Sequence, residues 1–140
     1  MPHFIPYLAF DGNCQEAMHF YQRVFGGKIT MMLSGADTPM ADQIPKEHAH
    51  RIIHARLVLK DGGTLMAGDV PADMPHQMPC GITISLIYDT VAEAERVFNA
   101  LGDGGKITMP WAPTFWAKQF GMVTDKYGTS WAINGEELKF

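Results

Sequence analysis

Apolar and polar positions alternate along this chain with two different periods. In residues 14–25, and again in residues 91–101, apolar positions recur every three or four residues, which predicts two amphipathic helices. Short apolar runs around these helices predict strands. The expected strands are 6–10, 28–33, 52–59, 64–67, 82–88 and 106–109, and a last hairpin is expected within 121–133. Each half of the chain therefore has the order strand, helix and then three strands.

Polar and proline-rich segments separate these elements. Residues 34–47 predict a long loop, residues 69–79 predict the crossover between the halves, and residues 111–120 predict an aromatic loop. Both helices are preceded by a capping-box pattern, one at Asn13 and the other at Thr90.

The hexapeptide Gly-Gly-Lys-Ile-Thr-Met occurs twice, at residues 26–31 and at residues 104–109, after each predicted helix. The same order of elements in both halves indicates two copies of one folding unit. One extra residue precedes the second glycine pair, near Asp103.

Length and composition restrict the class of protein. At 140 residues the chain is too short for two ordinary independent domains, so we predict one domain over residues 1–140, with units at about 3–70 and 80–138 that share a core. The net charge of −4 and the scattered basic residues argue against nucleic-acid binding. No apolar run approaches the roughly 20 residues that span a bilayer. Because the N-terminus also lacks an export signal, we expect a cytoplasmic protein without a membrane partner.

Polar side chains with possible chemistry lie on the strand at 52–59. Its alternation places four residues on the core face, Ile53, Ala55, Leu57 and Leu59. It turns His54 and Arg56 away from the core, together with Ile52 and Val58. His54 is therefore the best candidate for a catalytic residue, although a histidine that only forms hydrogen bonds is the simpler interpretation. The two cysteines, Cys14 and Cys80, are too few for a disulfide framework and are expected to be buried or half-buried.

Several short stretches resemble one known superfamily. The order of elements, Phe20-Tyr21 in the first helix and Asp125-x-x-Gly128 in the last hairpin are similar to the vicinal oxygen chelate superfamily, which includes glyoxalase I, extradiol dioxygenases and bleomycin-resistance proteins. The matching stretches, which point more narrowly to its PhnB-like branch, are Pro6-Tyr7-Leu8, Gly12-Asn13-Cys14, Phe25-Gly26-Gly27, His54-Ala55, Leu65-Met66-Ala67, Gly104-Gly105-Lys106, Thr114-Phe115-Trp116 and Phe120-Gly121-Met122-Val123. The resemblance implies an α+β, glyoxalase-like fold in which two tandem βαβββ units form a curved sheet around a groove.

The superfamily's enzymes hold a divalent metal with four side chains, and the resemblance locates these positions in the present chain. They fall on Pro6, Thr83, Met66 or Ala67, and Ala132. None of these residues supplies the imidazole or carboxylate that such ions prefer, so we expect no metal at the inherited site and predict no cofactor.

A metal at a different site is a less favoured alternative. His48, His50 and His54 share one parity and would lie on one strand face if the strand began early. The positive charge of Arg56 beside them would oppose a cation.

Aromatic and methionine side chains are abundant enough to line a groove for a small organic ligand. The predicted groove residues are His54, Arg56, Met66, Asp69, Trp111, Phe115, Trp116 and Trp131. The alternative is that the aromatic residues pack between sheets or across a dimer interface. Asp69 either pairs with Arg56 or faces the groove, whereas Asp125 is expected to accept hydrogen bonds from the backbone of a turn.

Three classes of function follow. The favoured class is a small-molecule binding protein of the glyoxalase/bleomycin-resistance type, expected to be a homodimer, with an unidentified ligand. The alternative is an uncharacterised metal-dependent lyase, isomerase or dioxygenase, or an acid-base catalyst using His54. The third class is an interaction protein whose aromatic patch forms a dimer contact.

Two other interpretations have less support from the residues. PhnB-like sequences have often carried the label of a ubiquinone methyltransferase, but no nucleotide-type methyl-donor loop is present, so we reject that label. Their name also implies proximity to phosphonate metabolism, yet Arg51, Arg56 and Lys118 are too few to argue an anion clamp.

Overall fold

A computed structural model of the chain describes residues 2–39, 41–78 and 80–139. The helices and strands are β1 (Tyr7–Phe10), α1 (Cys14–Phe25), β2 (Lys28–Ser34), β3 (Ile52–Val58), β4 (Thr64–Asp69), β5 (Ile84–Tyr88), α2 (Val91–Gly102), β6 (Lys106–Ala112), β7 (Ala117–Thr124) and β8 (Ser130–Glu137). The predicted α+β class and the order strand, helix and three strands in each half are confirmed.

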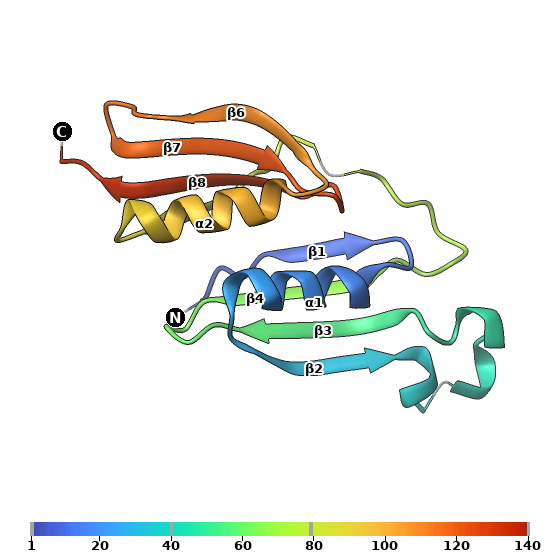
Figure 1. The fold of residues 1–140 in the computed structure, drawn as a ribbon. Coiled ribbons are helices and arrows are strands. Elements are labelled where there is room, and N and C mark those ends of the chain that lie inside the picture. Colours follow the sequence, from blue (N-terminus) through green and yellow to red (C-terminus); the bar gives the residue numbers. More distant parts are fainter. Residues whose placement is uncertain (1, 40, 79, 140) are drawn as a thin grey trace. The chain divides into compact units, whose positions relative to one another are not determined.

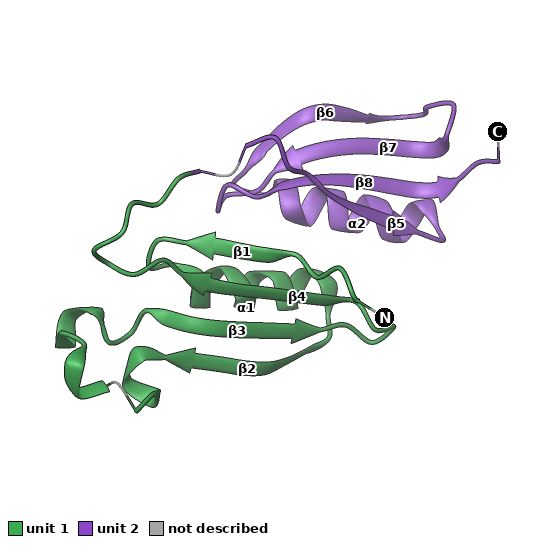
Figure 2. Cartoon of the chain, turned by 180° about the vertical axis from the view of Figure 1, so that it is seen from behind, with its two compact units in different colours: residues 1–77 green, residues 78–140 purple. Residues whose placement is uncertain are grey.

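The chain divides into two compact units, residues 1–77 and 78–140 (Figure 2). The predicted ranges 3–70 and 80–138 fall within these units. Whether the two share one core stays a prediction.

The described part of each unit contains one α-helix and one four-stranded sheet (Figure 1). The first sheet has the order β1-β4-β3-β2 and the second has the order β5-β8-β7-β6. The first and last strands of each unit pair in parallel, and the other neighbours are antiparallel. In the first unit α1 packs against β2, β3 and β4, and in the second α2 packs against the whole sheet. We call the sheet face that turns away from the helix the open face of that unit.

The two units differ by compensating changes in their turns. Three residues, 11–13, separate β1 from α1, whereas only Asp89 and Thr90 separate β5 from α2. After the helices the difference is reversed, because Asp103 adds one residue before the second glycine pair. The offset in sequence between β1 and β5 is therefore the same as the offset between the two glycine pairs. The match of Thr83 with Pro6, used to locate the metal positions, is wrong by one residue.

Helix and sheet enclose the core of each unit. Met18, Tyr21 and Leu57 are fully buried in the first unit, and Val97 and Trp131 are fully buried in the second. Asp125 is also buried, and its carboxylate accepts hydrogen bonds from the backbone of Tyr127 and Thr129 and from Nε1 of Trp131. Its predicted role as a turn residue is confirmed.

The structure differs from some of the local predictions. The segment 34–47 is a run of three short 3-10 helices, η1 (Gly35–Asp37), η2 (Ala41–Gln43) and η3 (Lys46–His48). The expected aromatic loop at 111–120 is mostly strand, because β6 extends to Ala112 and β7 begins at Ala117. Cys80 is exposed, while Cys14 is buried as expected.

At the start of β3, the side chains do not lie on the faces that the sequence predicts. The register between β2 and β3 shifts between Leu33 and Ser34, so that Leu33 pairs with His54 and Ser34 pairs with Ile52. Ile53 falls in this irregularity and is 51% exposed, whereas Ile52 is 3% exposed and joins the core. The assignments of Ile53 to the core and of Ile52 to the opposite face are therefore wrong, and those of Ala55 and Leu57 to the core are confirmed.

Candidate functional site

The open face of the first sheet carries three of the predicted site residues. His54 and Arg56 alternate with the buried Ala55 and Leu57 along β3, so they face away from α1. Met66 pairs with Arg56 across β3 and β4 and lies on the same face. The structure thus brings His54, Arg56 and Met66 together.

Strand pairing extends this group into a row across the whole sheet. Tyr7 pairs with Met66, Met66 with Arg56, and Arg56 with Met31, which places one residue from each strand side by side. We call Tyr7, Met66, Arg56 and Met31 the first row. The sequence did not single out Tyr7 or Met31 as a neighbour of Arg56, because only the register shows which residues of separate strands align.

The second unit has a row at the same place. Ser85 pairs with Ala132, Ala132 with Met122, and Met122 with Met109, and these four residues form the second row. Register therefore matches Arg56 with Met122. The first row contains a cation where the second row contains a thioether.

Arg56 has an unusual environment for a charged side chain. Its Nε atom is buried and has no hydrogen-bond partner within the described residues. The ion pairs formed by the described part of the chain, such as Arg51–Asp11 and Lys118–Glu136, do not include Arg56. Its cross-strand neighbours are the thioethers Met31 and Met66, so no carboxylate lies opposite it in the sheet.

Tyr7 and His54 add an aromatic surface beside this cation. Their rings stack with centroids 5.8 Å apart and an interplanar angle of 26°. The phenol of Tyr7 reaches over Gly68, where any Cβ atom would lie 2.6 Å from the phenol oxygen. Burial, with a smaller contribution from Cys14, raises the pKa of Tyr7, so the phenol keeps its proton and can donate a hydrogen bond.

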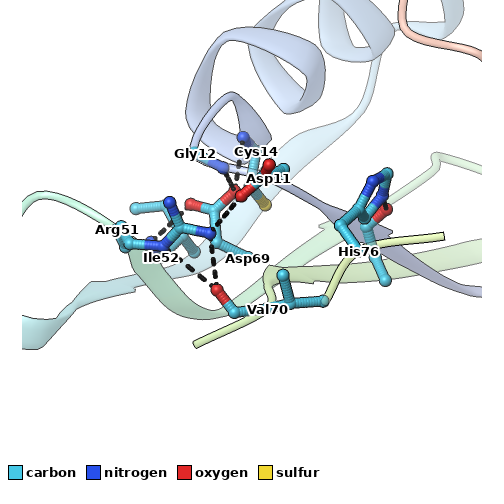
Figure 3. A network of polar contacts seen from close by, with 9 residues as sticks. Asp11, Gly12, Cys14, Arg51, Ile52, Asp69, Val70 and His76 are labelled. Atoms are coloured by element: carbon cyan, nitrogen blue, oxygen red, sulfur yellow. Dashed lines mark hydrogen bonds and ion pairs between the residues drawn. The ribbon is translucent and has the colours of Figure 1, made fainter. Parts of the chain in front are cut away.

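Asp69 belongs to a structural network instead of the open face (Figure 3). Its Oδ1 atom accepts hydrogen bonds from the backbone N–H groups of Gly12 (2.7 Å) and Cys14 (3.1 Å), and its Oδ2 accepts one from Ile52 (2.7 Å). Asp69 thus replaces the expected cap of α1, since Asn13 makes no side-chain cap bond. Neither of the two roles predicted for Asp69 describes this arrangement.

Arg51 is engaged in the same network. Its Nε and Nη2 atoms donate to the carbonyl oxygen of Val70 (3.0 and 2.6 Å), and Nη2 also donates to Asp11 Oδ1 at 2.7 Å (Figure 3). This bond to Arg51 lowers the pKa of Asp11. Of the three cations considered from the sequence, Arg51 is thus engaged here, Lys118 is paired with Glu136, and only Arg56 is left without a described partner.

A cavity of about 460 Å³ opens in the first unit, next to this network. Its walls come from the 3-10 segment, the start of β3 and the chain after β4, and they include Ile44, His48, Ile53 and Val70. Arg51 and Asp69 also line it, but Nε and Nη2 of Arg51 and both carboxylate oxygens of Asp69 already bind other parts of the unit. The cavity is large enough for a small ligand and is a second candidate location.

The predicted aromatic residues of the second unit lie on different faces. Gly121 faces Phe98 of α2, and the ring of Trp111 lies beside both, with its centroid 4.9 Å from that of Phe98. Trp131 is 1% exposed and also belongs to the helix side. Both tryptophans therefore lie on the helix side of this sheet, where Trp131 is a core residue and Trp111 is half-buried.

Trp116 and Phe115 remain on accessible surface. Trp116 packs against the cluster of Ala117, Phe120 and Ala132, and its Nε1 donates to Asn134 Oδ1 at 3.1 Å. Phe115 is 72% exposed and lies edge-on to Trp116, with ring centroids 4.9 Å apart. The sequence missed Asn134, which also donates to the side chain of Ser85 and links β8 to β5.

The residues considered for metal binding are separated in the fold. His48 ends η3, His50 lies in the following turn, and His54 lies within β3, so the three do not share a strand face. Among the described residues no group of three His, Cys, Asp or Glu side chains is placed to hold a metal ion. The expectations concerning a metal or cofactor stay predictions.

The metal positions implied by the superfamily can be compared with the two rows. Of the implied positions, Met66 and Ala132 lie in the rows, where their partners are Tyr7 and Ser85 instead of the predicted Pro6 and Thr83. A phenol, a thioether, a hydroxyl and a methyl group do not form the imidazole and carboxylate set that a divalent ion of this kind prefers. The chemistry of these groups supports our expectation of no metal at the inherited site, which stays a prediction.

Comparison with known proteins identifies the family. Residues 2–134 match the family described as 3-demethylubiquinone-9 3-methyltransferase. The chain belongs to this PhnB-like family. Protein YjdN from Escherichia coli (strain K12) is 35% identical to it over 92% of each sequence. Membership does not by itself assign the activity in the family's description.

Solved structures of similar proteins share the fold. Protein PA1353 from Pseudomonas aeruginosa is 44% identical, with a TM-score of 0.88 over 97% of this chain and 98% of that one. The PhnB protein from Bacillus cereus is 26% identical, with a TM-score of 0.73 over 95% and 98% of the chains. A glyoxylase/bleomycin resistance protein/dioxygenase domain from Frankia is only 13% identical, but its TM-score of 0.65 over 97% and 98% confirms the predicted glyoxalase-like fold.

Neither helix that the structure describes has the length and apolar character needed to cross a membrane.

Proposed function

We propose that this family member binds a small organic molecule and lacks the metal ligands of the superfamily's enzymes. The observation that carries the proposal is the first row, with Arg56 between two methionines and the Tyr7–His54 stack at its end. Thioethers and ring faces adapt to flat apolar ligands, while a few polar groups fix the orientation. The expected ligand has a planar, largely apolar body that lies along the row.

Titration calorimetry with 1-naphthamide, a neutral planar probe, tests this proposal. We expect saturable binding that weakens about fivefold to tenfold in Met66→Ala, because the ligand loses apolar contact area. Met109→Ala removes a thioether from the second row, at the position that matches Met31, and is the control for a general loss of methionine. No binding to the unmodified protein would contradict the proposal.

The cavity beside η3 is tested in the same experiment. Ile53→Trp adds bulk at the cavity wall, while the open-face residues are unchanged. Binding that is weakened by Ile53→Trp and unaffected by Met66→Ala would assign the ligand to the cavity and contradict the open-face proposal.

The alternative function is a metal-dependent lyase, isomerase or dioxygenase. His54 is the residue that would favour it, because it lies half-buried beside Tyr7 and near Arg56 on the open face. Metal analysis of protein purified without chelators separates the alternatives. A stoichiometric divalent ion, together with an enzymatic activity that His54→Ala abolishes, would favour the metal-dependent enzyme. The proposal of a binding protein without the metal would then be wrong.

A further inference from the structure

We infer that the ligand of the first row carries an oxyanion, such as a carboxylate or phosphonate, that pairs with Arg56. This inference rests on the proposed function and adds the charge of the ligand to it. It depends on three features of Arg56: a buried atom without a partner among the described residues, the absence of an acid opposite it in the described sheet, and the apolar residue at the matching position.

The unsatisfied atom is the strongest of these features. The Nε of Arg56 is buried without a hydrogen-bond partner in the described part of the chain. A buried donor left without an acceptor costs folding free energy, more so when it belongs to a charged group. A ligand that offers acceptor oxygens would remove this cost, and a guanidinium matches the two oxygens of a carboxylate or phosphonate.

The surroundings of Arg56 favour an anion from outside the unit. Its partners in the sheet are Met31 and Met66, and the next residues on the same face of β3 are His54 and Val58. Asp69, the acid on the neighbouring strand, is bound to three backbone N–H groups. A cation in this apolar setting is screened less by solvent than one on an open surface, which strengthens its attraction for an anion.

The comparison between the units argues against a purely structural role. The second row has Met122 at the position of Arg56, and its sheet keeps the same strand order and register. The fold therefore does not require a cation at this position. For the same reason Arg56→Met is expected to fold, since it recreates in the first row a thioether found in the second.

The experiment compares an acid with its neutral amide on the full chain. We expect calorimetry to give about tenfold tighter binding for 1-naphthoate than for 1-naphthamide at low salt. Arg56→Met should reduce this ratio to about one, mainly by weakening the binding of 1-naphthoate. Arg56→Lys should retain part of the preference, because it keeps the charge but loses the planar pair of donors. The ratio of 1-naphthylphosphonate to 1-naphthoate affinities identifies which oxyanion binds better.

The control is Arg23→Met, which removes an exposed arginine from the last turn of α1 and should leave the preference unchanged. Equal binding of acid and amide to the unmodified protein would overturn the oxyanion inference while leaving the proposed function intact. A preference that survives Arg56→Met would overturn it as well. If neither probe binds, both the proposed function and the inference fail.

Discussion

Arg56 combines a cost to folding with a possible gain in binding. Because its buried Nε lacks a partner among the described residues, Arg56→Met should raise the free energy of unfolding by about 1 kcal/mol in the absence of ligand. Urea unfolding followed by circular dichroism measures this change. Arg51→Met is the matched comparison and should lower stability, since Arg51 bonds to Val70 and Asp11. A loss of stability in Arg56→Met would mean that Arg56 supports the fold.

Asp69 has a role opposite to that of Arg56, because both of its oxygens are satisfied within the unit. Asp69→Ala leaves the N–H groups of Gly12, Cys14 and Ile52 without their acceptor and should cost about 2–3 kcal/mol of unfolding free energy. Asp73→Ala removes an exposed carboxylate nearby and should change stability by less than about 0.5 kcal/mol. Similar small effects from both variants in urea titrations would show that Asp69 is not an important helix cap.

The thiol of Cys14 should make the unfolding free energy depend on pH in the alkaline range. Burial, and to a lesser degree the charge of Asp69, raises the pKa of its thiol from 9.0 to about 12. Between these values the unfolded chain releases the proton while the folded chain keeps it, so the unfolding free energy should fall as the pH rises through this window. Urea titrations between about pH 8.5 and 11 should therefore have a shallower pH dependence in Cys14→Ala. Equal pH dependence in the two proteins would contradict the assigned burial.

At the scale of elements, the close approach of neighbouring backbone explains why the glycine pair of the hexapeptide is repeated after each helix. Gly27 has a positive φ of 84°, and a Cβ atom there would collide with the carbonyl oxygen of Val58. In the second unit the corresponding Gly105 approaches the carbonyl oxygen of Thr124 in the same way. The second glycine of each pair is therefore required where the chain passes from helix to strand next to the end of a neighbouring strand.

This close approach predicts a large difference between the two glycines of a pair. Gly27→Ala should cost about 3 kcal/mol or more, because the strained φ and the collision act together. Gly26→Ala should cost only about 1 kcal/mol, since Gly26 has a positive φ but no atom within 4 Å of its Cβ position. Thermal unfolding of both variants tests the difference, and equal melting temperatures would rule out the collision.

Elements were predictable where a local period determines them. The helix at 14–25 matches α1 at both ends because its apolar stripe and the following glycine are local features. The exposure of Ile53 was not predictable, because it depends on an irregular register with β2. The cap of α1 was assigned to Asn13, but Asp69 supplies it from β4, a residue distant in sequence. The candidate site follows the same division: parity located His54 and Arg56, whereas only strand pairing aligned Tyr7 and Met31 with them.

At the scale of the whole molecule, the two copies of the folding unit have different residues at matching positions of the same sheet. The two rows have the same register, yet only the first contains a charged residue, with the Tyr7–His54 stack beside it. The second unit instead links Trp116, Asn134 and Ser85 by hydrogen bonds across its open face. Binding and structural roles can therefore separate between copies of one fold, which is why a residue of the second row serves as the control for Met66→Ala.

The expected homodimer is a prediction at this same scale, and Phe115 is the residue with which to test it. Phe115 is 72% exposed, and the turn that carries it is held by the Thr114 hydroxyl, which accepts hydrogen bonds from the N–H groups of Trp116 and Ala117. An exposed aromatic ring on an ordered turn loses little entropy when a second chain covers it.

We expect sedimentation to give about twice the chain mass of 15.5 kDa at micromolar concentration, with Phe115→Ser raising the dissociation constant about tenfold. Phe4→Ser, which changes a fully exposed phenylalanine near the N-terminus, is the control and should leave association unchanged. A dimer unaffected by Phe115→Ser would place the interface elsewhere, and a monomer at all concentrations would exclude the homodimer.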